Sequence, residues 1–296
     1  MEGIILSIYL ETNALIKLTD YNCKEHTFTS IFSIFELLSG LTEKDFKVRQ
    51  SCIKRVFKHK LTIKGPMVDK LFMQFVGKND FNEYAYKMIW DSAKKLCKSK
   101  NYAEFNKGRL LVTFKDNHSE LISPIKWLSE WDKSISNITA ESKNFFEEEN
   151  AEYIRNLYNK KGEKGLANHF FTKYYDNRLN YTRLNHAEPF VGTEKIEEIK
   201  LEADNLFSRY NYKLFITAQA VIFAKAHFID GGTQDKNNPS DLLHLLYLDE
   251  NDKLVSGDNI YTSIFRGCEY FNHIKLEDNE TSLSNLIRKQ TSQTSN

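Results

Sequence analysis

Four acidic residues in this chain stand where side chains could do chemistry. Glu11 ends an apolar stretch at 4–10, and Glu36 lies inside an apolar helical run. Asp241 and Asp258 come much later, the first near an expected helix start and the second just after an expected strand. A parallel sheet presents its site beside the ends of its strands. Carboxylates gathered there would form an oxygen-rich pocket suited to Mg²⁺ or Mn²⁺.

The order of these motifs resembles the PIN-domain family of metal-dependent nucleases, of the VapC type. The chain reads ETN at 11–13, FELLSG at 35–40, SDLLH at 240–244 and SGD at 256–258. The family pattern is a strand ending in Asp-Thr-Asn, a Glu inside a helix, an Asp near a later helix start, and Thr-x-Asp/Asn after the next strand. The resemblance covers about residues 1–75 and 230–276.

This resemblance implies a role for each matching residue. The expected catalytic residues are Glu11, Glu36, Asp241 and Asp258, with Glu11, Asp241 and Asp258 as metal ligands. Glu36 would complete the cluster or orient a metal-bound water. Supporting contacts are expected from Thr12, Asn13 and Ser256. The implied reaction is hydrolysis of a phosphodiester bond, most often in RNA, by water that Mg²⁺ or Mn²⁺ activates.

Glu11 departs from the family pattern, which has Asp at this position. The extra methylene moves the carboxylate by more than ~1 Å, and a shift of this size can cost ~10²-fold in rate. A degenerate, PIN-like protein that binds nucleic acid or a protein partner is therefore the alternative. A phosphatase is a lesser rival, because the chain lacks the Asp-x-Asp and Gly-rich phosphate signatures. His244, one turn after Asp241, is either a packed helix histidine or a catalytic base.

The elements that must position these residues follow from apolar patterning and capping signals. The pattern predicts strands at 4–10, 61–63 and 254–256, and helices at 14–18, 33–40, 42–59 and 67–76. Thr12 or Asn13 is expected to cap the first helix and Thr42 the third, while Gly40 ends the second. Strands alternating with helices in this way predict an α/β fold.

At 296 residues, the chain is long enough for two domains or for one domain with a large insertion. We expect a PIN-like core with a central parallel sheet flanked by helices, split between residues 1–76 and 206–289. A mainly helical insertion would occupy 77–205, with helices at 84–98, 125–135, 142–158 and 164–178, followed by one at 194–228. Residues 290–296 form a polar tail that we expect to be disordered.

A row of basic side chains lies on the expected helix at 42–59. Lys47, Lys54, Arg55 and Lys58 fall within an arc of roughly 100° at 100° per residue. Such a row is either a solvated helix face or a track for phosphate groups, whose affinity would then depend on salt.

Composition excludes several classes of protein. The net charge of +1 argues against a polybasic protein, and 41% hydrophobic residues can fill a core. No apolar run approaches the ~18 residues that span a bilayer. The four cysteines are scattered, without metal or disulfide spacing, which favours the cytoplasm. RNA is the expected partner, and no membrane partner is expected. The family resemblance is also compatible with a homodimer, an inhibitory protein partner and a role as toxin of a toxin–antitoxin pair or defence effector.

Overall fold

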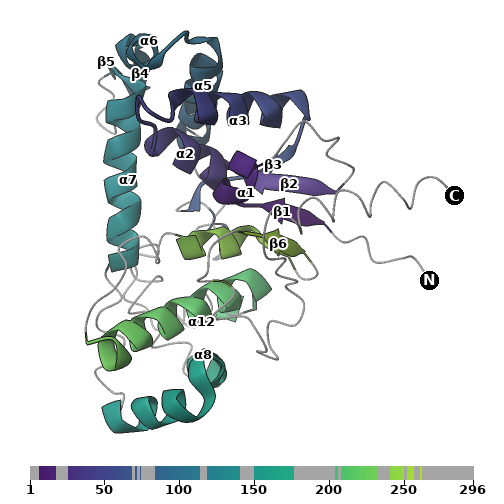
Figure 1. Cartoon of the computed structure of the whole chain (residues 1–296), viewed down its shortest axis with the longest axis vertical. Coiled ribbons are helices and arrows are strands. Elements are labelled where there is room, and N and C mark those ends of the chain that lie inside the picture. The colour runs from purple at the N-terminus through teal and green to yellow at the C-terminus, as the bar shows by residue number, and fades with distance from the viewer. Residues whose placement is uncertain are drawn as a thin grey trace, which may run out of the picture.

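A computed structural model describes residues 7–17, 26–68, 71, 74, 84–113, 119–140, 150–176, 204–205, 208–231, 241–249, 252–256 and 261. These residues form helices around a four-stranded sheet, together with a two-stranded hairpin (Figure 1). Several expectations, including Asp258, most of the helix at 67–76 and the tail at 290–296, fall outside the described residues.

The central sheet is entirely parallel and has the order β3-β2-β1-β6. Its strands are β1 (Ile8–Leu10), β2 (Thr27–Ser30), β3 (Thr62–Lys64) and β6 (Lys253–Val255). Tyr9 pairs with Phe28 on one side and with Leu254 on the other. Distant parts of the chain therefore meet at the first strand. The expected α/β class, with a parallel sheet flanked by helices, is confirmed at this level.

Three helices follow the first strands: α1 (Thr12–Lys17), α2 (Ile31–Ser39) and α3 (Phe46–Lys58). α2 begins two residues before the expected start, because the side chain of Ser30 accepts a hydrogen bond from the Ser33 amide and caps the helix. It ends before Gly40, as predicted. The expected start of α3 at Thr42 is wrong. Thr42 and Asp45 hydrogen-bond to each other within a turn, and the helix begins only after Asp45.

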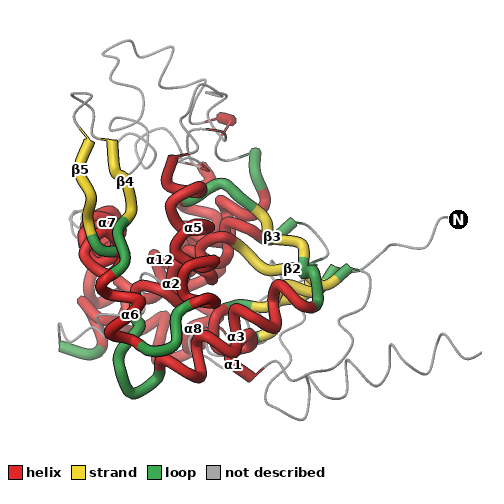
Figure 2. Tube along the Cα trace, turned by 90° about the horizontal axis from the view of Figure 1, so that it is seen from above, coloured by secondary structure: helices red, strands yellow, loops and turns green. Residues whose placement is uncertain are grey.

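The expected insertion is mainly helical, but it also contains a hairpin. Its elements are α5 (Tyr84–Lys98), α6 (Tyr102–Lys107), β4 (Leu110–Thr113), β5 (Ser119–Ile122), α7 (Pro124–Ala140) and α8 (Ala151–Asp176). The predicted bounds of α5 are confirmed. β4 and β5 pair in antiparallel fashion, apart from the central sheet (Figure 2). The helices predicted at 142–158 and 164–178 correspond, over the described residues, to the two halves of α8, which meet at a kink at Gly162, where φ is 61°.

The remaining helices pack mainly against one another. α12 (Tyr210–Ala224) continues as a π-helix, η3 (Lys225–Ile229), and packs against α8 and the 3-10 helix η4 (Leu242–Tyr247). Figure 1 shows α2, α3 and α5 on one side of the sheet and α12 on the other. Gly231, with φ of 66°, follows this helical run and confirms the predicted stop. In the part of the chain that the structure describes, no helix is long and apolar enough to cross a membrane.

Candidate active site

The candidate site lies where β1, β2 and β6 end. Glu11 follows the last residue of β1, Ser256 follows the last residue of β6, and α2 with Glu36 begins directly after β2. The backbone amide of Glu11 donates to the carbonyl of Val255 at 3.5 Å, so the ends of β1 and β6 are neighbours. Parallel strands end at one edge of their sheet, and this edge is where such folds bind ligands.

Glu11 is a buried residue that caps the N-terminus of helix α1. Its side chain is 1% exposed, and its two carboxylate oxygens accept hydrogen bonds from the amides of Asn13 at 2.7 Å and Ala14 at 3.1 Å. Its carbonyl accepts from the amide of Leu15 at 2.9 Å. These are the bonds of an N-cap residue. The expectation that Thr12 or Asn13 caps this helix is therefore wrong, because the carboxylate of the preceding residue already occupies the amides.

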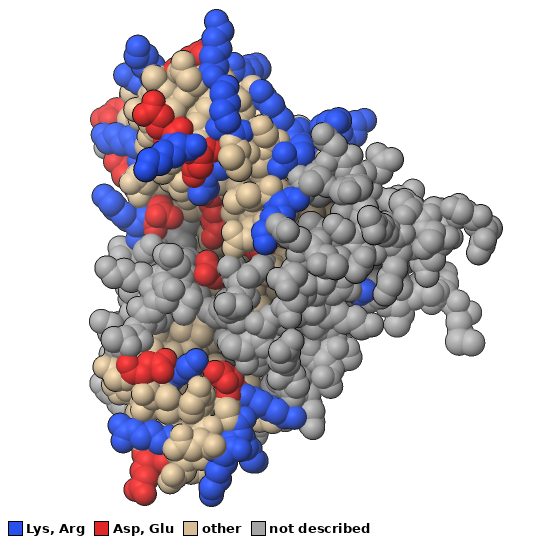
Figure 3. All heavy atoms as spheres, in the orientation of Figure 1, with Lys and Arg blue, Asp and Glu red and all other residues tan. Residues whose placement is uncertain are grey.

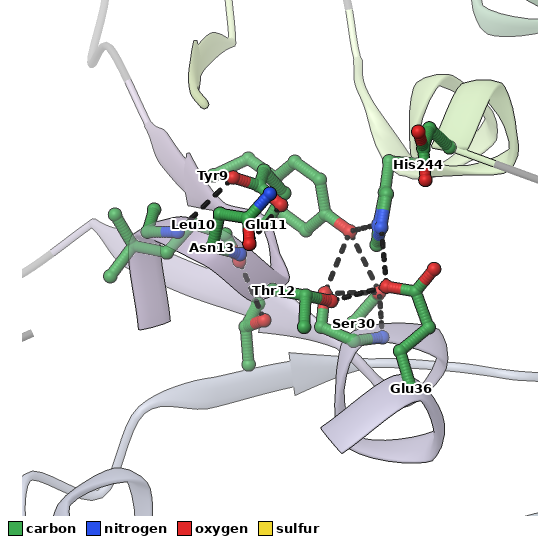
Figure 4. Close-up of polar contacts among 12 residues, drawn as sticks. Tyr9, Leu10, Glu11, Thr12, Asn13, Ser30, Glu36 and His244 are labelled. Atoms are coloured by element: carbon green, nitrogen blue, oxygen red, sulfur yellow. Dashed lines mark hydrogen bonds and ion pairs between the residues drawn. The ribbon is translucent and has the colours of Figure 1, made fainter. Parts of the chain in front are cut away.

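A buried chain of hydrogen bonds joins α2 to η4 (Figure 4). Oε2 of Glu36 accepts from the hydroxyl of Thr12 and lies 2.8 Å from Nε2 of His244. Nδ1 of His244 lies 2.7 Å from the hydroxyl of Tyr9, which in turn lies 2.8 Å from Oγ of Ser30. Figure 4 shows the other carboxylate oxygen of Glu36 turned away from this chain. One oxygen of Glu36 is thus held in place by two side chains.

His244 is both packed and hydrogen-bonded. Its side chain is 2% exposed, and its ring lies 5.0 Å from the ring of Phe32. Burial lowers the pKa of His244, but Tyr9, Glu36 and Glu11 together raise it by more. The pKa of His244 therefore lies well above its ordinary value. The expected packed histidine is found here, and it also orients a predicted catalytic carboxylate.

Tyr261 connects Asp241 to the region of Glu11 and Glu36. Its side chain is fully buried, and its hydroxyl donates a hydrogen bond to the backbone carbonyl of Asp241. Burial raises the pKa of this phenol, and the carboxylates of Glu11, Asp241 and Glu36 raise it further, to well above its ordinary value. Three carboxylates from separate parts of the sequence therefore act on one buried hydroxyl group.

A fourth carboxylate comes from the expected insertion. Asp132 lies on α7, which packs against α2. Its side chain reaches the surface, but neighbouring atoms partly desolvate its carboxylate, which raises its pKa, and the negative charge of Glu36 raises it further. Asp132 was not predicted from the sequence, because a lone aspartate in a helix has no distinguishing signal. Tyr9 and Tyr261 were not predicted either, although Tyr9 is the one polar side chain within β1.

The structure therefore brings together some of the predicted site residues. Glu11, Glu36 and Asp241 share neighbours, whereas Asp258 lies outside the described residues. Ser256 is buried after β6, and Asn13 meets Glu11 through its backbone amide. Within the described ranges, no three His, Cys, Asp or Glu side chains are grouped so that they could hold a metal ion.

The predicted basic row lies on α3. Lys47, Lys54 and Lys58 are exposed along one side of the helix. Arg55 is half-buried, and its guanidinium donates to the carbonyl of Ile16 on α1 at 3.2 Å. Arg55 thus joins α3 to α1, whereas the three lysines face solvent.

Comparison with known proteins gives no relative of this chain. No family model, no curated protein and no solved structure matches it. The function must therefore be argued from the site itself.

Proposed function

We propose that this protein is a PIN-like, metal-dependent nuclease that cleaves RNA internally. One observation carries the proposal: the hydroxyl of buried Tyr261 bonds the backbone of Asp241, and, in addition to burial, the negative charges of Glu11, Glu36 and Asp241 all raise the pKa of this phenol. These residues come from the end of β1, from α2 and from the start of η4, in the order of the motifs that resemble the PIN family. Such convergence of negative charge is costly without a cation.

The chemistry of these side chains fits a hard divalent cation. Carboxylate oxygens suit Mg²⁺ and Mn²⁺ better than metals that prefer sulfur or imidazole. Glu11, Asp241 and Asp258 would hold the ion, which would supply an activated water and stabilise charge on the phosphate. Thr12 and His244 hold one oxygen of Glu36, which leaves the other oxygen to orient a water or substrate.

A second candidate function is a degenerate PIN-like protein that binds nucleic acid or a protein partner without cleaving it. The observation that favours it is the capping role of Glu11. Both oxygens of this carboxylate already accept backbone hydrogen bonds within α1. A carboxylate held this way has fewer lone pairs to offer a metal.

Cleavage assays separate the two functions. Labelled single-stranded RNA, hairpin RNA and single-stranded DNA would be incubated with Mg²⁺, Mn²⁺ or EDTA. Glu36→Gln and Asp241→Asn test the site, because neither residue forms the α1 cap. Glu152→Gln, at an exposed position on α8, is the matched control. We expect RNA cleavage that needs metal, is lost in both site variants and persists in the control.

A metal-binding measurement completes this test. Mn²⁺ should raise the melting temperature of the wild type, and less so that of Asp241→Asn, since a ligand that binds the folded state stabilises it. Cleavage that survives in both site variants would refute the proposed site. If no substrate is cut and Mn²⁺ leaves the melting temperature unchanged, the degenerate binding protein becomes the better conclusion.

A further inference from the structure

Positive charge is concentrated at one end of the molecule. Residues 42–60 and 84–109 contain 14 Lys and Arg but only four Asp and Glu, a net charge of +10. The whole chain has a net charge of +1, so the rest is negative. The two segments contain α3, α5 and α6, and Figure 3 shows Lys and Arg side chains gathered over this end.

Two helices in this region carry the same basic pattern. The row on α3 consists of Lys47, Lys54, Arg55 and Lys58. The row on α5 consists of Lys87, Lys94, Lys95 and Lys98. Both follow the spacing i, i+7, i+8 and i+11, which confines each row to an arc of roughly 100° on its helix. In each row, the first, second and fourth side chains are exposed and the third is half-buried.

The two rows lie next to each other because α3 and α5 pack in opposite directions. The side-chain amide of Gln50 donates to the carbonyls of Leu96 at 2.7 Å and Ser99 at 2.6 Å. Near the other end of α3, the ring of Phe57 stacks on that of Trp90, with 5.2 Å between centroids. Each row lies opposite the buried side of its helix, so the two rows share one solvent-facing surface, which we call the two-helix basic face.

The dimensions of this face follow from helix geometry. Each row spans 11 residues, or about 16 Å at 1.5 Å per residue. Packed helix axes lie about 8–10 Å apart, which sets the separation of the rows. Nearby acidic groups offset little of the charge: Lys94 and Asp91 form an exposed pair at 4.0 Å. The two charges of such an exposed ion pair attract each other only weakly in water, so Lys94 stays available to another anion. Repulsion among these cations favours a polyanionic partner.

The face suits a duplex better than a single strand. Proteins that hold single strands stack bases on exposed aromatic rings. Here Phe57 and Trp90 stack on each other and are partly buried. Of the large hydrophobic side chains that the structure describes on α3 and α5, the exposed one is Val48, which is not aromatic. Among the side chains of α3 and α5 that the structure describes, the face therefore offers charge for phosphates and no exposed aromatic ring on which a base could stack.

We propose that the two-helix basic face binds the phosphate backbone of double-stranded RNA. The choice of a duplex rests on the face alone, while the choice of RNA rests on the proposed ribonuclease function. Two cationic rows can contact phosphates of both strands across the narrow major groove of an A-form helix. The face is joined to the candidate site through Arg49 of α3, which donates to the carbonyl of Glu36 at 2.9 Å.

Binding in EDTA tests this face without requiring cleavage. Fluorescence anisotropy would compare double-stranded RNA of about 20 base pairs, longer than the ~16 that a compact double-strand binder covers, with DNA duplex and single-stranded RNA of the same sequence. A variant with Lys54→Gln, Lys58→Gln, Lys94→Gln and Lys98→Gln removes four of the eight positive charges in the two rows. The matched control, Lys160→Gln with Lys161→Gln, changes exposed lysines on α8. Thermal unfolding of every variant verifies the fold.

We expect double-stranded RNA to bind most tightly, with an affinity that falls steeply with salt. The four-lysine variant should reduce the slope of log K against log salt by about 1 per lysine, about 4 in all. The control should leave the slope unchanged. An unchanged slope in the four-lysine variant, or tighter binding of single-stranded RNA, would overturn the duplex assignment. Equal binding of DNA duplex would overturn the choice of RNA. A failure to cleave would count only against the proposed nuclease, because this binding needs no metal.

Discussion

Replacing Glu11 with alanine tests whether this buried carboxylate holds α1 in place. The substitution removes two hydrogen bonds to backbone amides, those of Asn13 and Ala14. A hydrogen bond to a charged group contributes about 1.5–3 kcal/mol, whereas measured N-caps contribute about 0.5–2 kcal/mol. We therefore expect Glu11→Ala to lower the free energy of unfolding by about 2–3 kcal/mol.

Urea unfolding followed by circular dichroism, in EDTA, measures this effect without any contribution from metal. Glu11→Asp keeps a carboxylate that can cap the helix, so its loss of unfolding free energy should be about half that of Glu11→Ala or less. Asn101→Ala is the matched control, because Asn101 caps α6 at an exposed position, where its side chain accepts from the amide of Glu104 at 2.8 Å. A loss in Glu11→Ala no larger than in Asn101→Ala would refute the argument that burial strengthens this cap.

Three further predictions concern other buried or paired groups. His244→Phe should lower the free energy of unfolding by about 1–3 kcal/mol, since it leaves buried hydrogen-bonding groups without their partner; an unchanged urea midpoint would contradict this. Burial raises the pKa of Cys52 to about 12, so iodoacetamide at pH 8 should modify half-buried Cys97 before Cys52, as peptide mapping would reveal. Lys225→Met removes the ion pair with Glu163 and should lower the free energy of unfolding by about 0.5–1 kcal/mol at pH 7. The lowered pKa of Glu163 means that this cost vanishes as pH falls through that pKa; a cost that persists in acid would refute the pairing.

The elements near the N-terminus were largely predictable from the sequence. Apolar patterning located β1, α2 and β3, and Gly40 marked the end of α2, because these signals act over a few residues. The start of α3 was misjudged because Thr42 and Asp45 can bond to each other within a turn as well as within a helix. The hairpin β4–β5 was missed, since its strands are short and lie between strong helical patterns.

The candidate site was predictable only in part. Glu11, Glu36 and Asp241 were identified from their positions beside strand and helix ends. Their hydrogen-bond partners were not. Which amides Glu11 accepts from depends on the first turn of α1, and the partnership of Glu36 with His244 joins residues 208 positions apart.

The sequence by itself determined where many of the helices and strands form and which carboxylates lie beside them, because local propensity and periodicity depend on near neighbours. The tertiary structure alone decided which of these groups meet. The insertion of β6 beside β1 brings η4 against α2, so His244 reaches Glu36. The packing of α7 on α2 adds Asp132, and the packing of α3 on α5 aligns two basic rows. These contacts depend on burial across distant segments, which no short stretch of sequence encodes.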